Sequence, residues 1–433
     1  MLDLTKLARQ MQGISQHLSQ EAIATRNRLA LAEQLLQQAS DRQAELVTLQ
    51  QTWRDRLGFA AAEPMEPLDT RVDLSAAPNV HTVLATDGSQ IAPSHHEIAY
   101  CYLINVGRIA LHYGQNRHPL LDSLPEVFYR PEDLYRSRQW GIRTEEWMGY
   151  CRTVSETTAL AELAIQRGNG RDTINHNGGD TINQDGGDAI NQDGGDAINR
   201  VPPLWEQPTL WEQPTLAMVD GSLIHWFLEP LPADARDRIL PPILTAWEQL
   251  RQARIPLVGY LSAARSGEAL NFLRLQTCPY EVPDCQSHCP GQTEQAPCQV
   301  FAPLRDTALW SMVLQPGQRG PLWRSSAKIL EWYDNQTIYF CYVNVGAEIA
   351  RVEFPAWVAE DAVLLETALS LTLTQVQKGY GYPVALAEAH NQAVVRGGDR
   401  ARFFALLERE MIRAGLQNIG TSYKEARKRG SIA

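Results

Sequence analysis

The spacing of apolar residues changes several times along the chain and divides it into segments. Through the first 55 residues, apolar side chains recur at alternating intervals of three and four (Leu4, Leu7, Met11, Ile14, Leu18). This spacing predicts one or two long amphipathic helices. Such an N-terminal arm either packs on its own domain or presents its apolar face to a second copy or another partner.

Strand and helix patterns alternate beyond residue 80. An apolar run at 83–85 leads into Asp87, and residues 97–112 are expected to form two strands joined by a turn at 105–107. The later elements expected are helices at 144–167, 234–253 and 267–275, strands at 216–219, 257–261, 337–343 and 347–353, and helices from about 360, 383 and 400. An antiparallel meander followed by α/β units predicts an α/β fold with a ribonuclease-H-like core, in which helices flank a mixed sheet.

Tandem repeats interrupt this order between residues 168 and 215. The eight-residue unit at 180–187 recurs at 188–195, and the six residues beginning at Leu204 are copied from Leu210. Low-complexity duplications of this kind predict a disordered surface insertion. A calcium-binding β-roll is the alternative, but repeats of that fold have a nine-residue period.

Composition limits the class of protein further. The chain has 433 residues, of which 44% are hydrophobic, enough for a sizeable core. We found neither an apolar run long enough to span a membrane nor a secretory signal, so we expect a cytoplasmic protein without membrane contact. The net charge of -11 opposes binding to a phosphate backbone, and any nucleic-acid binding therefore needs a local basic lining or a partner.

Two apolar runs each end in the same tripeptide, at Asp87-Gly88-Ser89 and Asp220-Gly221-Ser222. A single Asp-Gly pair is usually a turn. If both strands are neighbours in one sheet, however, the two carboxylates face each other and require a divalent cation between them. A third carboxylate is expected from the intervening helix, where Glu156 is preferred over the alternatives Glu145, Glu146 and Glu162.

Four of the seven cysteines fall within a short loop, at Cys278, Cys285, Cys289 and Cys298, with His288 beside them. In a reducing compartment this grouping indicates either a structural zinc or iron–sulfur site or unpaired thiols in a surface loop. The spacing contains no paired C-x2-C, so both readings stay open. The other three cysteines lie in apolar stretches and are expected in the core (Cys101, Cys151, Cys341).

The two Asp-Gly-Ser tripeptides, together with segments 351–357 and 381–390, resemble the NurA nuclease family over most of residues 80–395. The resemblance implies a ribonuclease-H-like nuclease domain at 80–395, with the insertion 168–215 and the cysteine-rich loop 278–298 inside it. It also implies manganese- or magnesium-dependent single-strand endonuclease and 5′-to-3′ exonuclease activity on DNA. The family acts in end resection at double-strand breaks, as a homodimer working with the hexameric HerA translocase.

Carried over residue by residue, the resemblance makes Asp87 and Asp220 metal ligands. Glu156 stands at the position of the family's helical glutamate and is expected as a further metal ligand, and His390 matches the histidine near the metal, where it is expected to act as a ligand or proton donor. Arg265 stands where relatives often carry a lysine.

Several side chains are expected to support DNA binding. Arg265, Lys378 and Tyr382 are the preferred contacts, and the further basic candidates are Arg319, Arg324, Lys328 and Arg351. Residues 396–433 are expected to form a helical region with a basic tail. Two other functions remain open, a catalytically silent binding subunit on the same scaffold and a ribonuclease.

Overall fold

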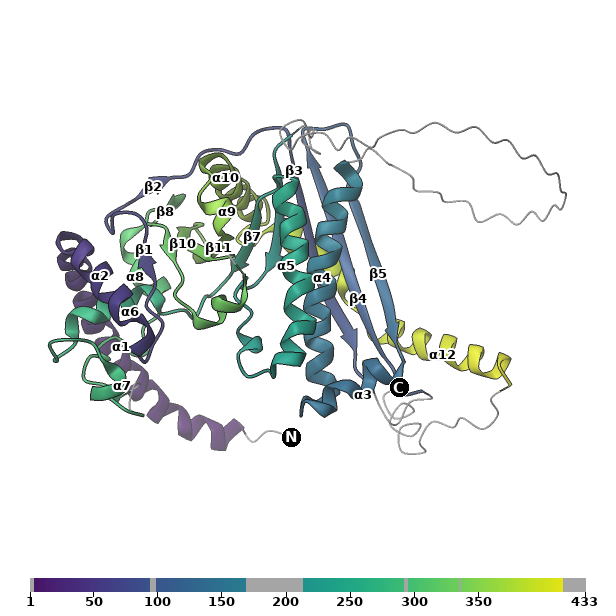
Figure 1. Cartoon of the computed structure of the whole chain (residues 1–433), viewed down its shortest axis with the longest axis horizontal. Helices are drawn as coiled ribbons and strands as arrows, with labels where there is room; N and C mark the ends of the chain where they lie inside the picture. Colours follow the sequence, from purple (N-terminus) through teal and green to yellow (C-terminus); the bar gives the residue numbers. More distant parts are fainter. Residues whose placement is uncertain (1–3, 94–98, 169–212, 292–294, 335, 416–433) are drawn as a thin grey trace, which may run out of the picture.

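A single large sheet organises the protein. The computed structural model describes residues 4–93, 99–168, 213–291, 295–334 and 336–415. Its main strands lie in the order β1-β9-β10-β11-β7-β6-β3-β4-β5 (Figure 1). Their bounds are β1 Glu63–Pro64, β2 Val72–Asp73, β3 His81–Ile91, β4 Tyr102–Tyr113, β5 Leu120–Phe128, β6 Thr215–Asp220, β7 Leu257–Leu261, β8 Gln318–Arg319, β9 Trp323–Arg324, β10 Ile338–Asn344 and β11 Ile349–Pro355.

The directions of the strands make this a mixed sheet. β3, β4 and β5 are antiparallel neighbours, whereas β6 lies parallel to β3 on one side and to β7 on the other. β11 then pairs antiparallel with β7 and β10 with β11. The expected mixed sheet flanked by helices is therefore present.

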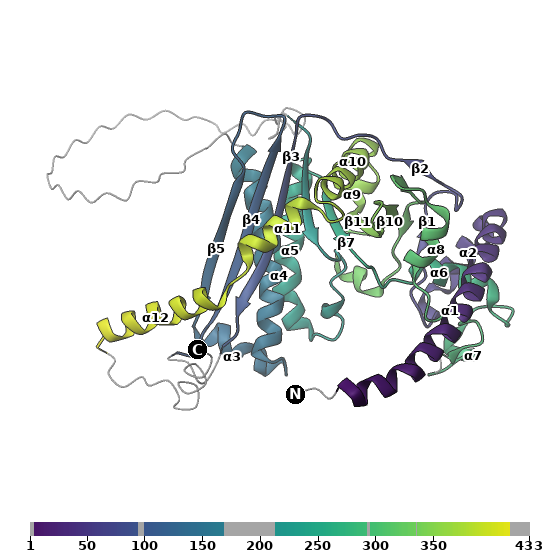
Figure 2. The ribbon, with the colours of Figure 1, turned by 180° about the vertical axis from the view of Figure 1, so that it is seen from behind.

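Helices cover both faces of the sheet. Helices α4 (Thr144–Gly168) and α5 (Ala233–Gln252) pack on one face, where Leu84 and Ala217 point. Helices α10 (Ala362–Lys378) and α11 (Val384–Ala393) pack on the other face, toward Val83 and Met218. Figure 2 shows α11 from this second side. Because successive strand residues point to opposite faces, the near-continuous apolar runs of β3 and β6 supply both cores.

A third core lies at the end of the sheet formed by β9 and β10. Here α1 (Leu4–Asp41) and α2 (Gln43–Trp53) pack against α6 (Glu268–Arg274) and α8 (Asp306–Val313) around Trp310 and Trp323. The contacts come from the second half of α1, while Leu4, Met11 and Leu18 in its first half are exposed. The remaining helices are α3 Pro131–Gln139, α7 Cys285–His288, α9 Ala356–Ala359 and α12 Gly397–Arg413.

The predicted turn at 105–107 is wrong. These residues lie inside the continuous strand β4, and Gly107 pairs with Asp87 of β3. A methyl group on Gly107 would come within 2.5 Å of the Ala389 carbonyl oxygen of α11. Asn105 also donates from Nδ2 to the Ala393 carbonyl, over 2.8 Å. The Asn and Gly residues are thus explained by close helix packing on a strand rather than by a turn.

The repeats at 169–212 lie outside the described residues, so the predicted disordered insertion stays a prediction. Its flanks are ordered, since α4 ends at Gly168 and β6 begins at Thr215. Across the described ranges, none of the helices is both long and apolar enough to cross a membrane.

Candidate active site

Asp87 and Asp220 lie side by side on neighbouring parallel strands. The register pairs Thr86 with Val219, which places the two aspartates next to each other one residue further on. β6 ends at Asp220, as expected, but β3 continues to Ile91. The expectation that both carboxylates stand at strand ends is therefore wrong for Asp87, because β4 continues to pair with β3 beyond this point.

Helix α11 and the turn before it cover the two aspartates on one face of the sheet. The Nδ1 atom of His390 lies 2.8 Å from Oδ2 of Asp87. The phenol of Tyr382 hydrogen-bonds the Asp220 carboxylate, and its ring packs edge-on against Tyr260. The structure therefore places His390, expected near the metal, at Asp87. Tyr382, expected as a DNA contact, hydrogen-bonds Asp220, and its contact with DNA stays a prediction.

Glu156 approaches from helix α4, on the opposite face. Its carboxylate lies beside the Gly88 backbone N–H, which donates to Asp87 Oδ1 over 2.8 Å, and forms an ion pair with Arg152, whose Nε lies 3.1 Å from Oε1. A Cβ atom at Gly88 would collide with this carboxylate and with the Arg152 side chain. The glycine of the first Asp-Gly-Ser is thus required for the close approach of Glu156 to β3.

The three carboxylates affect one another electrostatically. Burial raises the pKa of Glu156 to about 7, and the charges of Asp87 and Asp220 add to the rise while Arg152 opposes it. Loss of water and repulsion from Asp87 also raise the pKa of Asp220, against the stabilising hydrogen bond from Tyr382. A divalent cation would relieve this repulsion, and carboxylate oxygens are the ligands that magnesium and manganese prefer.

The side chains are not arranged as a complete metal site. Within the described part of the chain, no three His, Cys, Asp or Glu side chains stand close enough together to hold an ion as they are. Glu156 faces Arg152 and Gly88 instead of a point shared with the aspartates. The donor set fits a hard divalent cation, and the Glu156 carboxylate would have to turn away from Arg152 to join it.

A cavity of about 420 Å³ opens beside these residues, lined by Asp87, Glu156, Asp220 and Arg152. Trp226, which is 46% exposed, stands at its border. The cavity is large enough for part of a nucleotide chain, and the indole offers a surface on which a base can stack.

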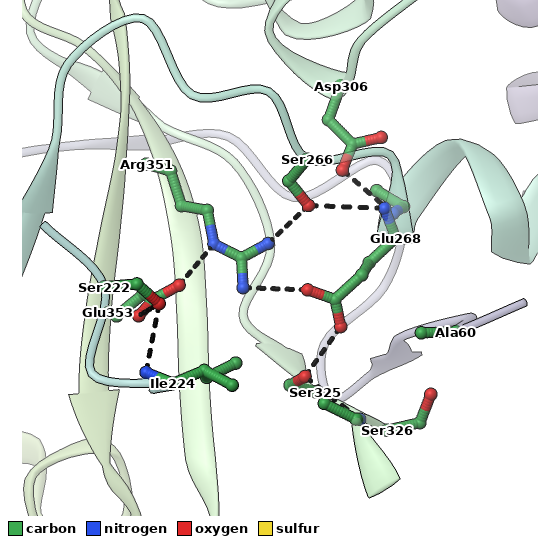
Figure 3. Close-up of polar contacts among 12 residues, drawn as sticks. Ala60, Ser222, Ile224, Ser266, Glu268, Asp306, Ser325, Ser326, Arg351 and Glu353 are labelled. Atoms are coloured by element: carbon green, nitrogen blue, oxygen red, sulfur yellow. Dashed lines mark hydrogen bonds and ion pairs between the residues drawn. The ribbon is translucent and has the colours of Figure 1, made fainter. Parts of the chain in front are cut away.

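A buried charge network holds the turn that follows Asp220 (Figure 3). Glu353 accepts hydrogen bonds from the Ser222 hydroxyl and the Leu223 N–H, at 2.8 and 2.7 Å. Arg351 donates to Glu353 at 2.7 Å and pairs with Glu268 of α6 at 2.9 Å. Burial lowers the pKa of Arg351, but the two glutamates outweigh this effect and raise it overall. The guanidinium therefore stays charged, and the network links the site to α6.

Not all of the expected DNA-binding cations are available. Arg351 is buried, while Arg319 and Arg324 are ion-paired with Glu66 and Glu63. The prediction that Arg351 contacts DNA is wrong, because its guanidinium is buried and paired with Glu268 and Glu353. Arg265 is exposed in the loop after β7 and remains a candidate.

Lys378 is also exposed, but it lies away from the aspartates. Its ammonium group lies over the ring of Tyr113, 4.8 Å from the centroid. Tyr113 pairs with His81 at the start of β3, about 20 Å along the strand from Asp87. Any contact of Lys378 with DNA would therefore occur outside the site.

Sequence reasoning missed the roles of Arg152 and Glu353. Arg152 is four positions before Glu156 on the same helix, the spacing of an ion pair, and this signal could have identified it. Glu353 alternates with Arg351 within an apolar strand, where charges are rare unless they are paired. That pattern indicates a buried network, although its partners come from distant segments.

The fold and this pocket define a mixed α/β protein with an acidic site on adjacent parallel strands. The NurA domain model matches residues 81–395, so the chain belongs to the NurA family, which confirms the resemblance and supports a nuclease role. The NurA nuclease from Sulfolobus solfataricus is similar in structure, with 10% sequence identity, a TM-score of 0.42 and coverage of 92% of this chain and 98% of that one. No curated protein matches this chain.

Proposed function

We propose that this protein is a metal-dependent nuclease that hydrolyses phosphodiester bonds in DNA. The observation that carries the proposal is the pairing of Asp87 and Asp220 on adjacent parallel strands, with His390 bonded to Asp87. Two neighbouring carboxylates with a third acid nearby are the donor set of magnesium and manganese phosphodiesterases. We also propose a ribonuclease-H-like core, which the order β5-β4-β3-β6-β7 supports.

Asp87, Asp220 and Glu156 would hold the divalent cation, manganese or magnesium. When bound, such a cation supplies an activated water and stabilises charge on the phosphate oxygens. His390 orients the Asp87 carboxylate, while Tyr382 does the same for Asp220. Arg152, which in this structure pairs with Glu156, becomes free to contact a phosphate when that glutamate turns toward the aspartates.

The finer assignments concern the substrate and the partners. We propose single-strand endonuclease and 5′-to-3′ exonuclease activity in end resection at double-strand breaks, in the cytoplasm, together with a HerA-type translocase. The net charge of -11 supports the need for a partner that delivers DNA, because the overall field repels it. Cleavage should accordingly fall as salt concentration rises.

We further propose a homodimer formed through the first half of α1. Leu4, Met11 and Leu18 repeat every seven residues and are 69%, 46% and 60% exposed, which is the pattern of a helix seam that packs on another helix. Light scattering of the full chain and of Leu18→Glu tests this proposal, since the charge would prevent pairing. If Leu18→Glu has the same mass in solution as the wild type, the proposal is contradicted.

The decisive experiment measures cleavage of end-labelled single- and double-stranded DNA, and of matched RNA, with manganese, magnesium or EDTA. Asp87→Asn and Asp220→Asn should each reduce manganese-dependent cleavage by more than about 100-fold. Asp237→Asn, an exposed carboxylate of α5, is the matched control and should cut like the wild type. Preference for RNA would redirect the proposal to a ribonuclease.

A catalytically silent binding subunit is the second candidate. The ion pair that holds Glu156 to Arg152 favours it, because this carboxylate is already neutralised without a cation. If the wild type is inert with every metal and with a HerA-type partner, yet still binds DNA, the silent subunit becomes the better description.

A further inference from the structure

The four cysteines of the loop 278–298 gather around one small cavity, although up to twenty positions separate them in the sequence. The cavity measures about 10 Å³ and is lined by all four of them together with His288. Cys285, Cys289 and Cys298 are buried, and none of the four forms a disulfide. The other three cysteines lie elsewhere, for example Cys341 in the central sheet.

Hydrogen-bond donors surround the sulfur atoms. Burial raises the pKa of the Cys278 and Cys285 thiols, and the backbone N–H groups of Tyr280 and Gly58, which donate to these sulfurs, oppose the rise. Nε of Arg274 lies 3.2 Å from Sγ of Cys298. A neutral thiol is a weak acceptor, whereas donors of this kind stabilise a thiolate. Metal-bound cysteine sulfurs are stabilised in the same way by neighbouring hydrogen bonds.

The backbone holds these cysteines in a defined arrangement. Asp284 caps the short helix α7 by accepting from the Ser287 N–H, and the Cys289 N–H donates to the Cys285 carbonyl, which fixes the two cysteines one helical turn apart. The Thr277 hydroxyl donates to the Cys298 carbonyl over 3.1 Å. This bond joins the first and last cysteine-bearing segments.

The loop has few apolar contacts of its own, although Arg56 pairs with Asp284 and Cys285 packs into the third core. Its own apolar cluster consists of Cys289, Ala296 and Cys298, and α7, with only four residues, is its one α-helix among the described positions. Small units with so little buried apolar surface usually require a disulfide or a metal. Because the thiols are free, a metal is the remaining means of cross-linking them.

We propose that the four cysteines of this loop together bind one zinc ion. Four thiolates form a closed structural zinc site of tetrahedral geometry. The cavity favours a single ion over an iron–sulfur cluster, since about 10 Å³ admits one water-sized sphere. The sulfur atoms border the cavity without converging on one point, as no ready metal-binding group exists in the described ranges. Binding therefore requires their side chains to rotate inward and lose their protons.

The site connects to the proposed active site through α6. Arg274 at the end of this helix contacts Cys298, and Glu268 at its beginning pairs with Arg351. Arg351 in turn holds Glu353, which fixes the turn after Asp220. The zinc site is nevertheless a structural proposal, and its test does not depend on nuclease activity.

The first test is the metal content of the full chain, purified without chelators after growth with both zinc and iron. An Asp87→Asn, Asp220→Asn background removes carboxylates from the acidic pocket, so that metal held there is not counted. The expected result is about one zinc per chain with almost no iron. Cys289→Ser and Cys298→Ser should lose most of this zinc, whereas Cys341→Ser, the matched buried control, should keep it.

A second measurement avoids variants that fail to fold. Stepwise modification of the wild-type thiols by a mercurial should release zinc in proportion, as followed with a colorimetric zinc indicator. Three results would overturn the proposal: wild-type protein without zinc, iron in its place with visible absorption, or retention of zinc by both Cys289→Ser and Cys298→Ser.

Discussion

The imidazole of His390 is bonded through Nδ1 to Oδ2 of Asp87 at 2.8 Å, although 303 positions separate the two residues in the chain. An ionised carboxylate can only accept a hydrogen bond, so Nδ1 is the donor in this pair. The 69% exposed His390 side chain thus orients one acid of the site while offering a second polar atom to solvent or substrate.

Replacing His390 should reduce activity far more than stability. His390→Ala removes the bond that orients Asp87, and we expect manganese-dependent cleavage to fall about 10- to 100-fold. His390→Asn, which keeps a side-chain donor, should retain more activity. Thermal unfolding should barely change because the residue is exposed. The control His118→Ala, at an exposed histidine outside the site, should leave cleavage and thermal unfolding unaltered. Equal cleavage by all three variants would contradict the role of His390 in orienting Asp87.

Two ion pairs of nearly equal length should contribute differently to the free energy of unfolding, because one is buried and the other is exposed. Arg351 Nε lies 2.7 Å from Glu353, and the exposed Arg251 lies 2.6 Å from Glu248. Arg351→Ala leaves two buried carboxylates unpaired and should lower the free energy of unfolding by about 3–5 kcal/mol. Arg251→Ala should cost about 0–1 kcal/mol. Urea denaturation measures both, and similar losses in the two variants would be inconsistent with the network described.

Glycine at position 107 should be required for the close packing of α11 against β4. Gly107→Ala places a methyl group 2.5 Å from the Ala389 carbonyl, so we expect a loss of about 1–3 kcal/mol in stability and weaker cleavage as His390 shifts. Gly149→Ala is the matched control in α4, where nothing lies within 4 Å of the added carbon. That variant should be slightly more stable than the wild type. Stabilisation by Gly107→Ala would disprove the close packing.

Stability should fall in mild acid because of His225. Burial lowers the pKa of this histidine to about 4, and its Nε2 has no hydrogen-bond partner among the described residues. The unfolded chain, with a pKa near 6.5, binds a proton first as the pH falls. The contribution of His225 to the free energy of unfolding is therefore fully present above pH 6.5. It is lost between pH 6.5 and about 4, by at most about 3 kcal/mol.

His225→Phe keeps an aromatic ring among Phe227, Trp247 and Tyr333 and removes the titrating group. Melting temperatures measured from pH 7 to pH 4 should therefore decline less steeply for this variant than for the wild type. Identical slopes would show that other groups cause the acid sensitivity.

Much of the element order could be predicted from the sequence. Helical spacing identified α1, α4, α5 and α10, and short apolar runs identified β6 and β7, because the type of an element depends mainly on local periodicity. The duplicated Asp-Gly-Ser tripeptides and the family resemblance singled out the aspartates, Glu156 and His390. Their identities as metal ligands remain predictions.

Only the tertiary structure decided how these elements and side chains meet. Asn105 and Gly107, whose residue types favour a turn, instead lie within strand β4, because helix α11 packs closely against them. Arg351, expected at DNA, is buried between Glu268 and Glu353, and Glu156 approaches from the other face of the sheet, where it pairs with Arg152. Local pattern determines helix or strand within a few residues, whereas partners far apart in the chain are selected by packing and by the need to pair every buried charge.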